Sequence, residues 1–301
     1  TSENYVDYFV TGGGRFDITG DAAVSLDLAH RKLHDDRGDP DTPDAASEPV
    51  EFTRSGAELG YTHRFNRFLT SFSVGAENED YDDVASIGGT ILDQDDRDNW
   101  AYTATGQIGY DLSPGYRPFV RLTYVRTEYD EGLLPPDSDS YEAVVGTTID
   151  LTSLLTGEVF AGYLSRDYDE DVYSDFTGVA YGLSLDYAVT QLTTISGDIS
   201  RGVEEGFGTT PNPRDRSTFQ IGVDHELLRN VILSARAEYR NDDYQETDRE
   251  EDFYLLQAGA TYTLNRNFYL RGTYTFSRRD SNQAGDDYDR NLFALRLGAQ
   301  L

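Results

Sequence analysis

The chain has 301 residues and is strongly acidic, with 55 Asp and Glu against 25 Lys and Arg and a formal net charge of -30 at pH 7. This charge argues against a nucleic-acid-binding protein, because contacts to phosphate need a basic surface. The absence of Cys excludes disulfides, thiolate zinc sites and cysteine nucleophiles. No apolar run is long enough for a transmembrane helix. Aromatic residues make up 13 % of the chain, which favours a folded protein over a disordered one.

The acidic residues are concentrated in seven segments of the chain. Together these segments hold 39 of the 55 acidic residues and only four arginines: 35–48, 79–98, 128–142, 167–175, 204–215, 242–252 and 280–289. The rest of the chain carries a small positive charge. The composition therefore describes a nearly balanced body with seven acidic insertions.

Seven short segments rich in turn-forming residues alternate with the acidic insertions. Their centres lie near residues 19, 65, 114, 153, 190, 229 and 265, about 41 residues apart on average. Gly, Asn, Asp and Pro at these centres are typical of hairpin turns. The chain therefore reads as a repeat of hairpins in which a tight turn alternates with a long acidic loop.

The segments between turns and loops alternate apolar and polar residues with a period of two. In the last segment, Phe293, Leu295 and Leu297 share one face, while Arg296 and Gly298 share the other. Such alternation predicts β-strands with one apolar face. The predicted strands are 5–18, 21–34, 50–63, 67–80, 99–111, 117–129, 141–151, 156–168, 175–187, 192–203, 215–227, 231–243, 252–264, 268–279 and 290–301.

The apolar face could meet either a second sheet, as in a soluble β-protein, or lipid. Strand lengths of ten or more residues, the strict alternation of short turns with long loops, and the Gly/Ser/Thr-rich polar face favour an outer-membrane barrel. Aromatic residues beside the short turns fit an interfacial girdle: Tyr61, Phe65, Phe68, Tyr110, Tyr187, Tyr262, Phe268 and Tyr269. A β-propeller is set aside, because each repeat holds two long strands and Trp100 is the only Trp. The predicted fold is an all-β, transmembrane, antiparallel up-and-down β-barrel of about 14–16 strands, forming a single domain over residues 1–301.

Fifteen strands is an odd number, whereas single-chain bacterial barrels have an even number. Either the first segment, 5–18, lies outside the barrel, or strands upstream of Thr1 complete it. The chain lacks an initiator Met and a signal peptide, so we expect it to be processed or trimmed at its start.

Six runs of the chain resemble one family of outer-membrane barrels. They are GRFDIT (14–19), RSGAELGYTHRFNR (54–67), DLTSLLTGEVFAGYL (150–164), DHELLRNVILSA (224–235), LNRNFYL (264–270) and SRRDSNQAGDDYDRN (277–291). The family is called putative beta-barrel porin 2, and its members usually extend further at the N-terminus. The resemblance implies a barrel in the bacterial outer membrane and supplies no catalytic motif. Because some members resemble components of exopolysaccharide machinery, it also raises polysaccharide export.

Charged residues on the polar face are candidates for lining a pore, because rings of charge set ion selectivity. The alternation assigns fourteen to the lumen: Glu58, Asp111, Arg121, Glu142, Asp150, Asp186, Asp198, Asp224, Glu226, Arg236, Glu238, Arg240, Arg271 and Arg296. Charges of both signs can also pair across the interior and block it, so an open and a filled lumen both stay open at this point.

Two acidic loops are candidates for loose calcium or magnesium binding. The candidate ligands are Asp93, Asp95, Asp96, Asp167, Asp169 and Asp171. An EF-hand is excluded, because Val172 and Gly178 stand where its Gly and Glu would be. His30 and His34 share a strand face and could chelate a metal, but histidines at the base of a loop are the plainer interpretation.

The primary hypothesis is a porin-like diffusion channel in the bacterial outer membrane, non-enzymatic, with an anionic extracellular mouth that favours small or cationic solutes. The expected partners are outer-membrane lipid and lipopolysaccharide, with polysaccharide as a further candidate and no nucleic acid. A first alternative is a structural barrel with an occluded lumen whose acidic loops bind divalent cations or surface polysaccharide. A second alternative is an exopolysaccharide export barrel. No cofactor is expected beyond loosely held calcium or magnesium.

Overall fold

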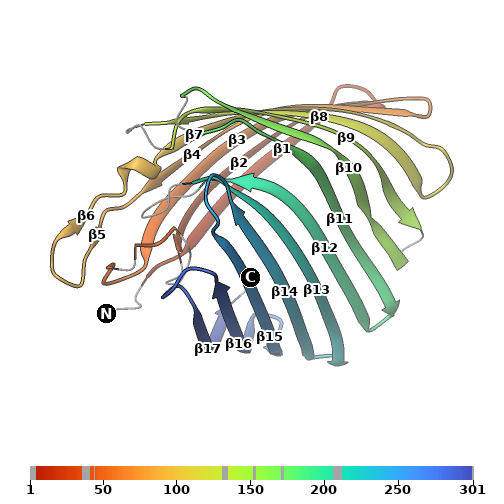
Figure 1. Cartoon of the computed structure of the whole chain (residues 1–301). Coiled ribbons are helices and arrows are strands. Elements are labelled where there is room, and N and C mark those ends of the chain that lie inside the picture. The colour runs from red at the N-terminus through yellow and green to blue at the C-terminus, as the bar shows by residue number, and fades with distance from the viewer. Residues whose placement is uncertain are drawn as a thin grey trace.

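The computed structural model of the protein describes residues 5–35, 41–43, 45–130, 135–151, 154–170, 173–205 and 212–299. Fifteen long strands form one antiparallel sheet, and each pairs with the next long strand along the chain. The sheet curls around a concave interior (Figure 1). This is the up-and-down arrangement expected from the repeated hairpins.

All fifteen predicted strands are confirmed, with ends within three residues of the expected ones. The first eight are β1 (Tyr8–Asp17), β2 (Ala22–Asp35), β3 (Val50–Phe65), β4 (Phe68–Tyr81), β7 (Asn99–Tyr110), β8 (Tyr116–Tyr129), β9 (Ser138–Leu151) and β10 (Leu155–Tyr168). The other seven are β11 (Phe176–Thr190), β12 (Thr193–Glu204), β13 (Arg214–Leu228), β14 (Val231–Tyr244), β15 (Glu250–Asn265), β16 (Phe268–Ser281) and β17 (Tyr288–Ala299).

Residues 82–98 contain structure that the alternation did not predict. This loop holds the two-stranded hairpin β5 (Val84–Ala85) and β6 (Ile91–Leu92), followed by the 3-10 turn η1 (Asp95–Arg97). In the described part of the chain, no helix is long and apolar enough to cross a membrane.

The tight turns gather at one end of the sheet and the long loops at the other, which we call the loop-side end. β3 and β4 are joined by only two residues, and Asn66 there adopts φ 54°. Asn tolerates this left-handed conformation better than most residues, which suits it to a two-residue hairpin turn. The acidic segments connect the strands at the loop-side end.

The pairing register separates each strand into an apolar outward face and a polar inward face. On the outward face, Leu59 pairs with Val74, and Val74 pairs with Ala104. Large apolar side chains on this face remain exposed; Val145, for example, has 63 % of its surface accessible. Within the described ranges no second layer of protein covers them, so hydrocarbon is the solvent that this face requires. The fold is that of an outer-membrane β-barrel.

Two belts of aromatic residues bound the outward apolar band. The belt beside the tight turns contains the predicted residues except Tyr269, which faces inward with its ring packed over Gly298. The second belt lies towards the loop-side end and contains Trp100, Tyr102, Tyr124, Tyr141, Tyr163, Tyr181, Tyr239, Tyr254 and Tyr274. Tyr254 and Tyr262 mark the two belts on β15, eight residues or about 27 Å apart along the strand. This spacing suits the roughly 25 Å apolar band of an outer membrane, allowing for strand tilt.

The inner face carries two small apolar cores instead of one large one. On β8, β9 and β11, Phe119, Val144 and Ala180 are buried together. The Phe119 ring packs directly over Gly146 of β9, where a Cβ atom would come within 2.5 Å of it. Aromatic rings stacked over glycines restore the contacts that the missing side chain would have made. A second core lies at the loop-side end and is described below.

β1 and β17 form the two ends of the sheet, and no hydrogen-bonded pairing joins them in the described ranges. Backbone groups facing hydrocarbon need hydrogen-bond partners, so both edges require pairing in a membrane. Because strand direction alternates along the sheet, β1 and β17 run the same way. An antiparallel closure would therefore need an odd number of additional strands.

The assignment of the faces can be tested with arginine substitutions at mid-strand. We expect Val145→Arg, on the lipid-facing side, to lower the free energy of unfolding by about 2–4 kcal/mol, because it places a charge in hydrocarbon. Thr105→Arg, on the inner face of the nearby β7, should cost much less. Denaturant unfolding in lipid vesicles measures both. A larger cost at Thr105 than at Val145 would reverse the two faces.

Candidate functional site: the inner face and the loop-side mouth

The register places thirteen of the fourteen predicted lumen residues on the inner face. They are Glu58, Arg121, Glu142, Asp150, Asp186, Asp198, Asp224, Glu226, Arg236, Glu238, Arg240, Arg271 and Arg296. The fourteenth, Asp111, lies one residue beyond the end of β7, at the tight-turn end, where it meets two inward-facing arginines. Its carboxylate accepts hydrogen bonds from Arg64 and from Arg117, the latter at 2.7 Å. Asp111 therefore braces two hairpins at the tight-turn end.

A hollow of about 540 Å³ lies along β1 to β7. Its floor is made of small residues, including Gly13, Gly56 and Gly75. Asp27 and Glu58 border it and stand directly opposite each other on β2 and β3. Both are exposed, and among the described residues neither forms an ion pair. Like charges placed opposite each other across strands destabilise a sheet, so this pair has a cost in stability. Glu77 and Arg31 also line the hollow, which leaves it anionic on balance.

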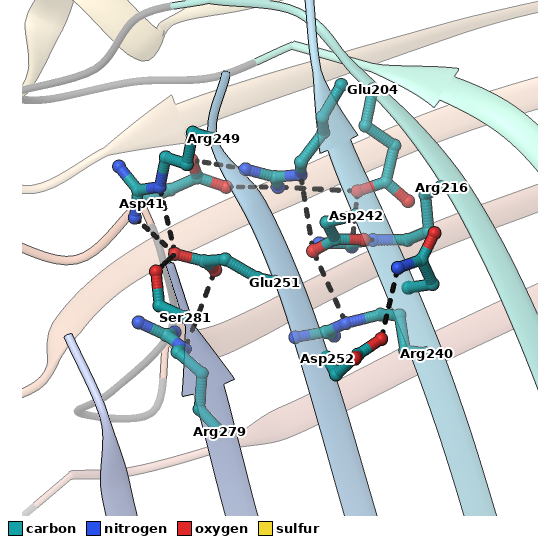
Figure 2. Close-up of polar contacts among 12 residues, drawn as sticks. Asp41, Glu204, Arg216, Arg240, Asp242, Arg249, Glu251, Asp252, Arg279 and Ser281 are labelled. Carbon is teal, nitrogen blue, oxygen red and sulfur yellow. Dashed lines mark hydrogen bonds and ion pairs between the residues drawn. The ribbon is translucent and has the colours of Figure 1, made fainter. Parts of the chain in front are cut away.

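On the opposite part of the sheet, an ion-paired network covers the inner face of β12 to β16 at the loop-side end (Figure 2). Arg216 holds Asp242 with two hydrogen bonds of 2.7 Å each. Arg240 lies 3.5 Å from the same carboxylate. Arg214 binds Asp41 through two hydrogen bonds of 2.9 and 2.6 Å. Paired guanidinium–carboxylate contacts of this kind are the strongest charged hydrogen bonds in proteins.

The same network continues across β15 and β16. Glu251 accepts a 2.9 Å hydrogen bond from Arg249 Nε and lies 3.7 Å from Arg279 Nε. The ring of Tyr244 lies between two guanidinium groups, 4.5 Å from Arg249 and 5.8 Å from Arg214. These contacts combine charge pairing with cation–π attraction.

The network is closed to solvent, although it lies on the inner face. Arg214 and Asp242 are each only 2 % exposed, and Arg249, Glu251 and Arg279 are also buried. Buried charges need partners of opposite sign, which the alternating bases and acids of the network supply. The pairing is not complete, because Nε of Arg214, Nε of Arg240 and the Tyr244 hydroxyl make no hydrogen bond within the described residues. A solute moving through the interior therefore meets the open hollow of β1 to β7 and not these arginines.

Sequence reasoning missed most of the network. The inward positions of Arg214, Arg216, Asp242, Glu251 and Arg279 follow from the same alternation, continued to the loop-side ends of the strands. The alternation could therefore have identified these five residues as inward-facing. No local signal pointed to Asp41, whose partner is 173 residues away in the chain.

Among the predicted cation-binding residues, the structure brings only Asp93 and Asp95 together. Their carboxylates join that of Asp83, and one oxygen from each lies within 4.8 Å of the others. Asp83 comes from the start of the same loop and was not predicted. Asp96 does not belong to this group.

The second predicted cluster is not assembled in the described residues. Asp167 lies on the outward side of β10 and accepts a hydrogen bond from Ser165 at 3.0 Å. Asp169 is bound by Arg126, with hydrogen bonds of 3.0 and 2.7 Å. Asp171 lies outside the described residues.

Three of the four histidines make separate side-chain contacts. His30 Nδ1 lies 2.9 Å from Ser55 Oγ, and His34 Nδ1 lies 2.9 Å from a carboxylate oxygen of Asp7. His225 Nδ1 lies 2.9 Å from Thr193 Oγ1. No group of possible metal ligands identified in the described ranges includes a histidine.

Arginines at the strand ends neutralise part of the acidic mouth. Arg97 is buried, lies over the Tyr81 ring at 3.9 Å and donates a 2.6 Å hydrogen bond to Asp35. Arg126 binds Asp169 in the same way from the outward side. The mouth is therefore less negative than a count of its carboxylates indicates.

The surroundings of Asp98, at the end of the 82–98 loop, disfavour the charged form of its carboxyl. Burial raises the pKa of its carboxyl to about 6, the hydrogen bond from the Tyr81 N–H opposes this, and the nearby charges of Asp80, Asp95 and Asp130 add to the increase. The hydrogen bond from Tyr81 measures 2.6 Å. Asp98 is thus a loop carboxyl that titrates near neutral pH.

Comparison with known protein families matches residues 1–301 to the family described as putative beta-barrel porin 2. No curated protein matches the chain. Among solved structures, the unliganded ferric citrate transporter FecA is similar with a TM-score of 0.52 and 10 % identity, covering 96 % of this chain and 55 % of that one. The ferric-catecholate import receptor Fiu from E. coli K12 is similar with a TM-score of 0.50 and 12 % identity, covering 96 % and 59 %. This chain thus spans little more than half of their length, and at such identity the likeness concerns the fold alone.

The raised pKa of Asp98 predicts a pH dependence of stability. The folded protein binds this proton more tightly than the unfolded chain, whose carboxyl titrates near 3.8, so the free energy of unfolding should rise as the pH falls from 7 through 6 towards 4. Asp98→Asn keeps an acceptor for the Tyr81 N–H and removes the charge. Its stability advantage over wild type, measured by denaturant unfolding, should therefore shrink between pH 7 and pH 4. A constant difference would contradict the assignment.

Proposed function

The chain belongs to the putative beta-barrel porin 2 family and forms a channel or transporter in the bacterial outer membrane, and from this premise we propose that it conducts small solutes passively and prefers cations. No catalytic role is part of the proposal. The polar inner face supplies an aqueous surface, and the outward face supplies the contact with lipid.

The observation that carries the proposal is the contrast between the two parts of the inner face. At the loop-side ends of β12 to β16, the basic residues of the network are largely buried in ion pairs, as the 2 % exposure of Arg214 illustrates. Asp27 and Glu58, in contrast, are exposed beside the hollow of β1 to β7. Three acids, Asp27, Glu58 and Glu77, and one base, Arg31, line the hollow, so its surface is acidic on balance. Arg271 and Arg296, exposed and opposite each other on β16 and β17, form a separate basic spot on the inner face.

An acidic surface of this kind acts on solutes through its electrostatic potential. Carboxylates beside a low-dielectric wall raise the local concentration of cations and lower that of anions. Rings or pairs of carboxylates in a pore select for cations in the same way. The unpaired loop carboxylates at the mouth add to this potential, within the reach of about 8–10 Å that physiological salt permits.

Ion selectivity in planar bilayers tests this proposal. We expect the wild-type reversal potential in a potassium chloride gradient to show a cation preference, and the Asp27→Asn/Glu58→Gln double variant to lose most of it, because these carboxylates border the open path. The matched control is Asp169→Asn/Asp215→Asn, which removes two carboxylates already paired with arginines on the outward side. Anion preference in the wild type, or equal loss in both double variants, would overturn the proposal.

A second function is favoured by the geometry of the 82–98 loop. We propose that Asp83, Asp93 and Asp95 bind a divalent cation, because three exposed carboxylates converge within 4.8 Å. Calcium takes six to eight oxygen ligands, so water or a lipid phosphate would complete the shell. Such a cation could join the acidic loops to lipopolysaccharide, whose phosphates are also anionic. This would make the loop a surface-interaction element beside the channel.

Calcium titration tests the cation site directly. We expect binding with a dissociation constant of roughly 10⁻⁴–10⁻³ M, as in other exposed extracellular sites, and loss of this binding in Asp93→Asn. Asp96→Asn is the control, since Asp96 is next to Asp95 in sequence but outside the group. Isothermal titration in detergent measures both. Equal weakening by the two substitutions would indicate diffuse charge attraction and no defined site.

Polysaccharide export remains a prediction from the family resemblance. The exposed carboxylates of the inner hollow suit an acidic polymer poorly, because they repel it. A neutral polymer would not meet this obstacle.

A further inference from the structure

Asp41, in the connection between β2 and β3, contacts a distant part of the sheet. β2 and β13 occupy the second and eleventh places in the strand order, nine strand spacings apart. At about 4.8 Å per spacing, that is roughly 43 Å along the curved sheet. Yet Asp41, which follows β2, binds Arg214 on β13 at 2.6 Å. Asp41 therefore reaches Arg214 across the mouth and not along the wall.

The other end of this loop is fixed to a small folded module at the mouth. Ala46 and Val50 are buried in a core with Phe52, Tyr81 and Val84. The backbone also pairs with the β5 strand, since Ser47 N–H donates to the Ala85 carbonyl at 2.8 Å. The loop is thus anchored firmly on the β3 side and held on the β13 side by Asp41.

We propose that residues 41–43 and 45–49 form a strap across the mouth, latched by the Asp41–Arg214 ion pair, and that releasing the latch widens the path for solutes. The Asp41 and Arg214 side chains are only 13 % and 3 % exposed, so salt screens their attraction weakly. The effect on conductance rests on the proposed channel function; the latch itself does not.

The surroundings of Arg214 allow the latch to open without damage to the wall. Arg214 also lies 3.4 Å from Glu204 and 4.0 Å from Asp242. When Asp41 departs, these carboxylates continue to balance the buried guanidinium. Removing Asp41 therefore avoids the large penalty of an uncompensated buried charge, whereas removing Arg214 would leave several acids without their base.

The first experiment compares Asp41→Ala with Asp169→Ala in planar bilayers. Each variant removes one loop carboxylate bound by an arginine, but the Asp169 partner, Arg126, lies on the outward side and not across the mouth. We expect single-channel conductance to rise roughly twofold in Asp41→Ala and to change little in Asp169→Ala, because only the first opens the path. Equal changes in the two variants would overturn the strap as a determinant of conductance.

A distance measurement tests the latch independently of conductance. The chain has no cysteine, so spin labels can be placed at Thr42→Cys and Thr218→Cys alone. We expect one narrow distance distribution in the otherwise wild-type protein and a broad, longer one when Asp41→Ala is added. An unchanged distribution would overturn the latch. A broadened distribution with no conductance in any variant would support the latch and overturn the channel function.

Discussion

The fold depends on one constraint: backbone N–H and C=O groups that face hydrocarbon have to be bonded within the sheet. The fifteen-stranded antiparallel ladder meets this requirement strand by strand, and this explains why so acidic a chain needs so little hydrophobic core. Most of its large apolar residues lie on the outward face, where side chains such as Val145 are exposed to lipid. The interior is then free to carry charge.

The charge is arranged differently on two parts of the inner face. One part, on β12 to β16, compensates its arginines and carboxylates locally and excludes solvent from them. The other, on β1 to β7, leaves Asp27 and Glu58 exposed opposite each other, with Arg31 as the one base among the residues that line the hollow. Ion pairs contribute to stability mainly when several charges form a network. In the β12 to β16 network, Arg214, Arg216 and Arg240 share Asp242 in this way. The net charge of the chain is therefore a poor guide to the potential that a solute meets.

Much of this arrangement could be predicted from residue alternation. A period of two is a local property, so the strands, the outward aromatics and the inward position of residues such as Glu58 or Arg296 could be derived without coordinates. Asp111 lies one residue beyond the end of β7, and its contacts with the inward-facing Arg64 and Arg117 place its carboxylate at the tight-turn end of the interior. The meeting of Asp83 with Asp93 and Asp95, and of Asp41 with Arg214, depends on the path of irregular loops. No periodic pattern encodes such a path, so these contacts could not be predicted.

The core formed by Ala46, Val50, Phe52, Tyr81 and Val84 joins two connections of the chain to the β3–β4 pair. Ala46 lies between β2 and β3, and Val84 lies between β4 and β7. Because each connection supplies part of the same core, the two should order together and unfold together as one local cooperative unit.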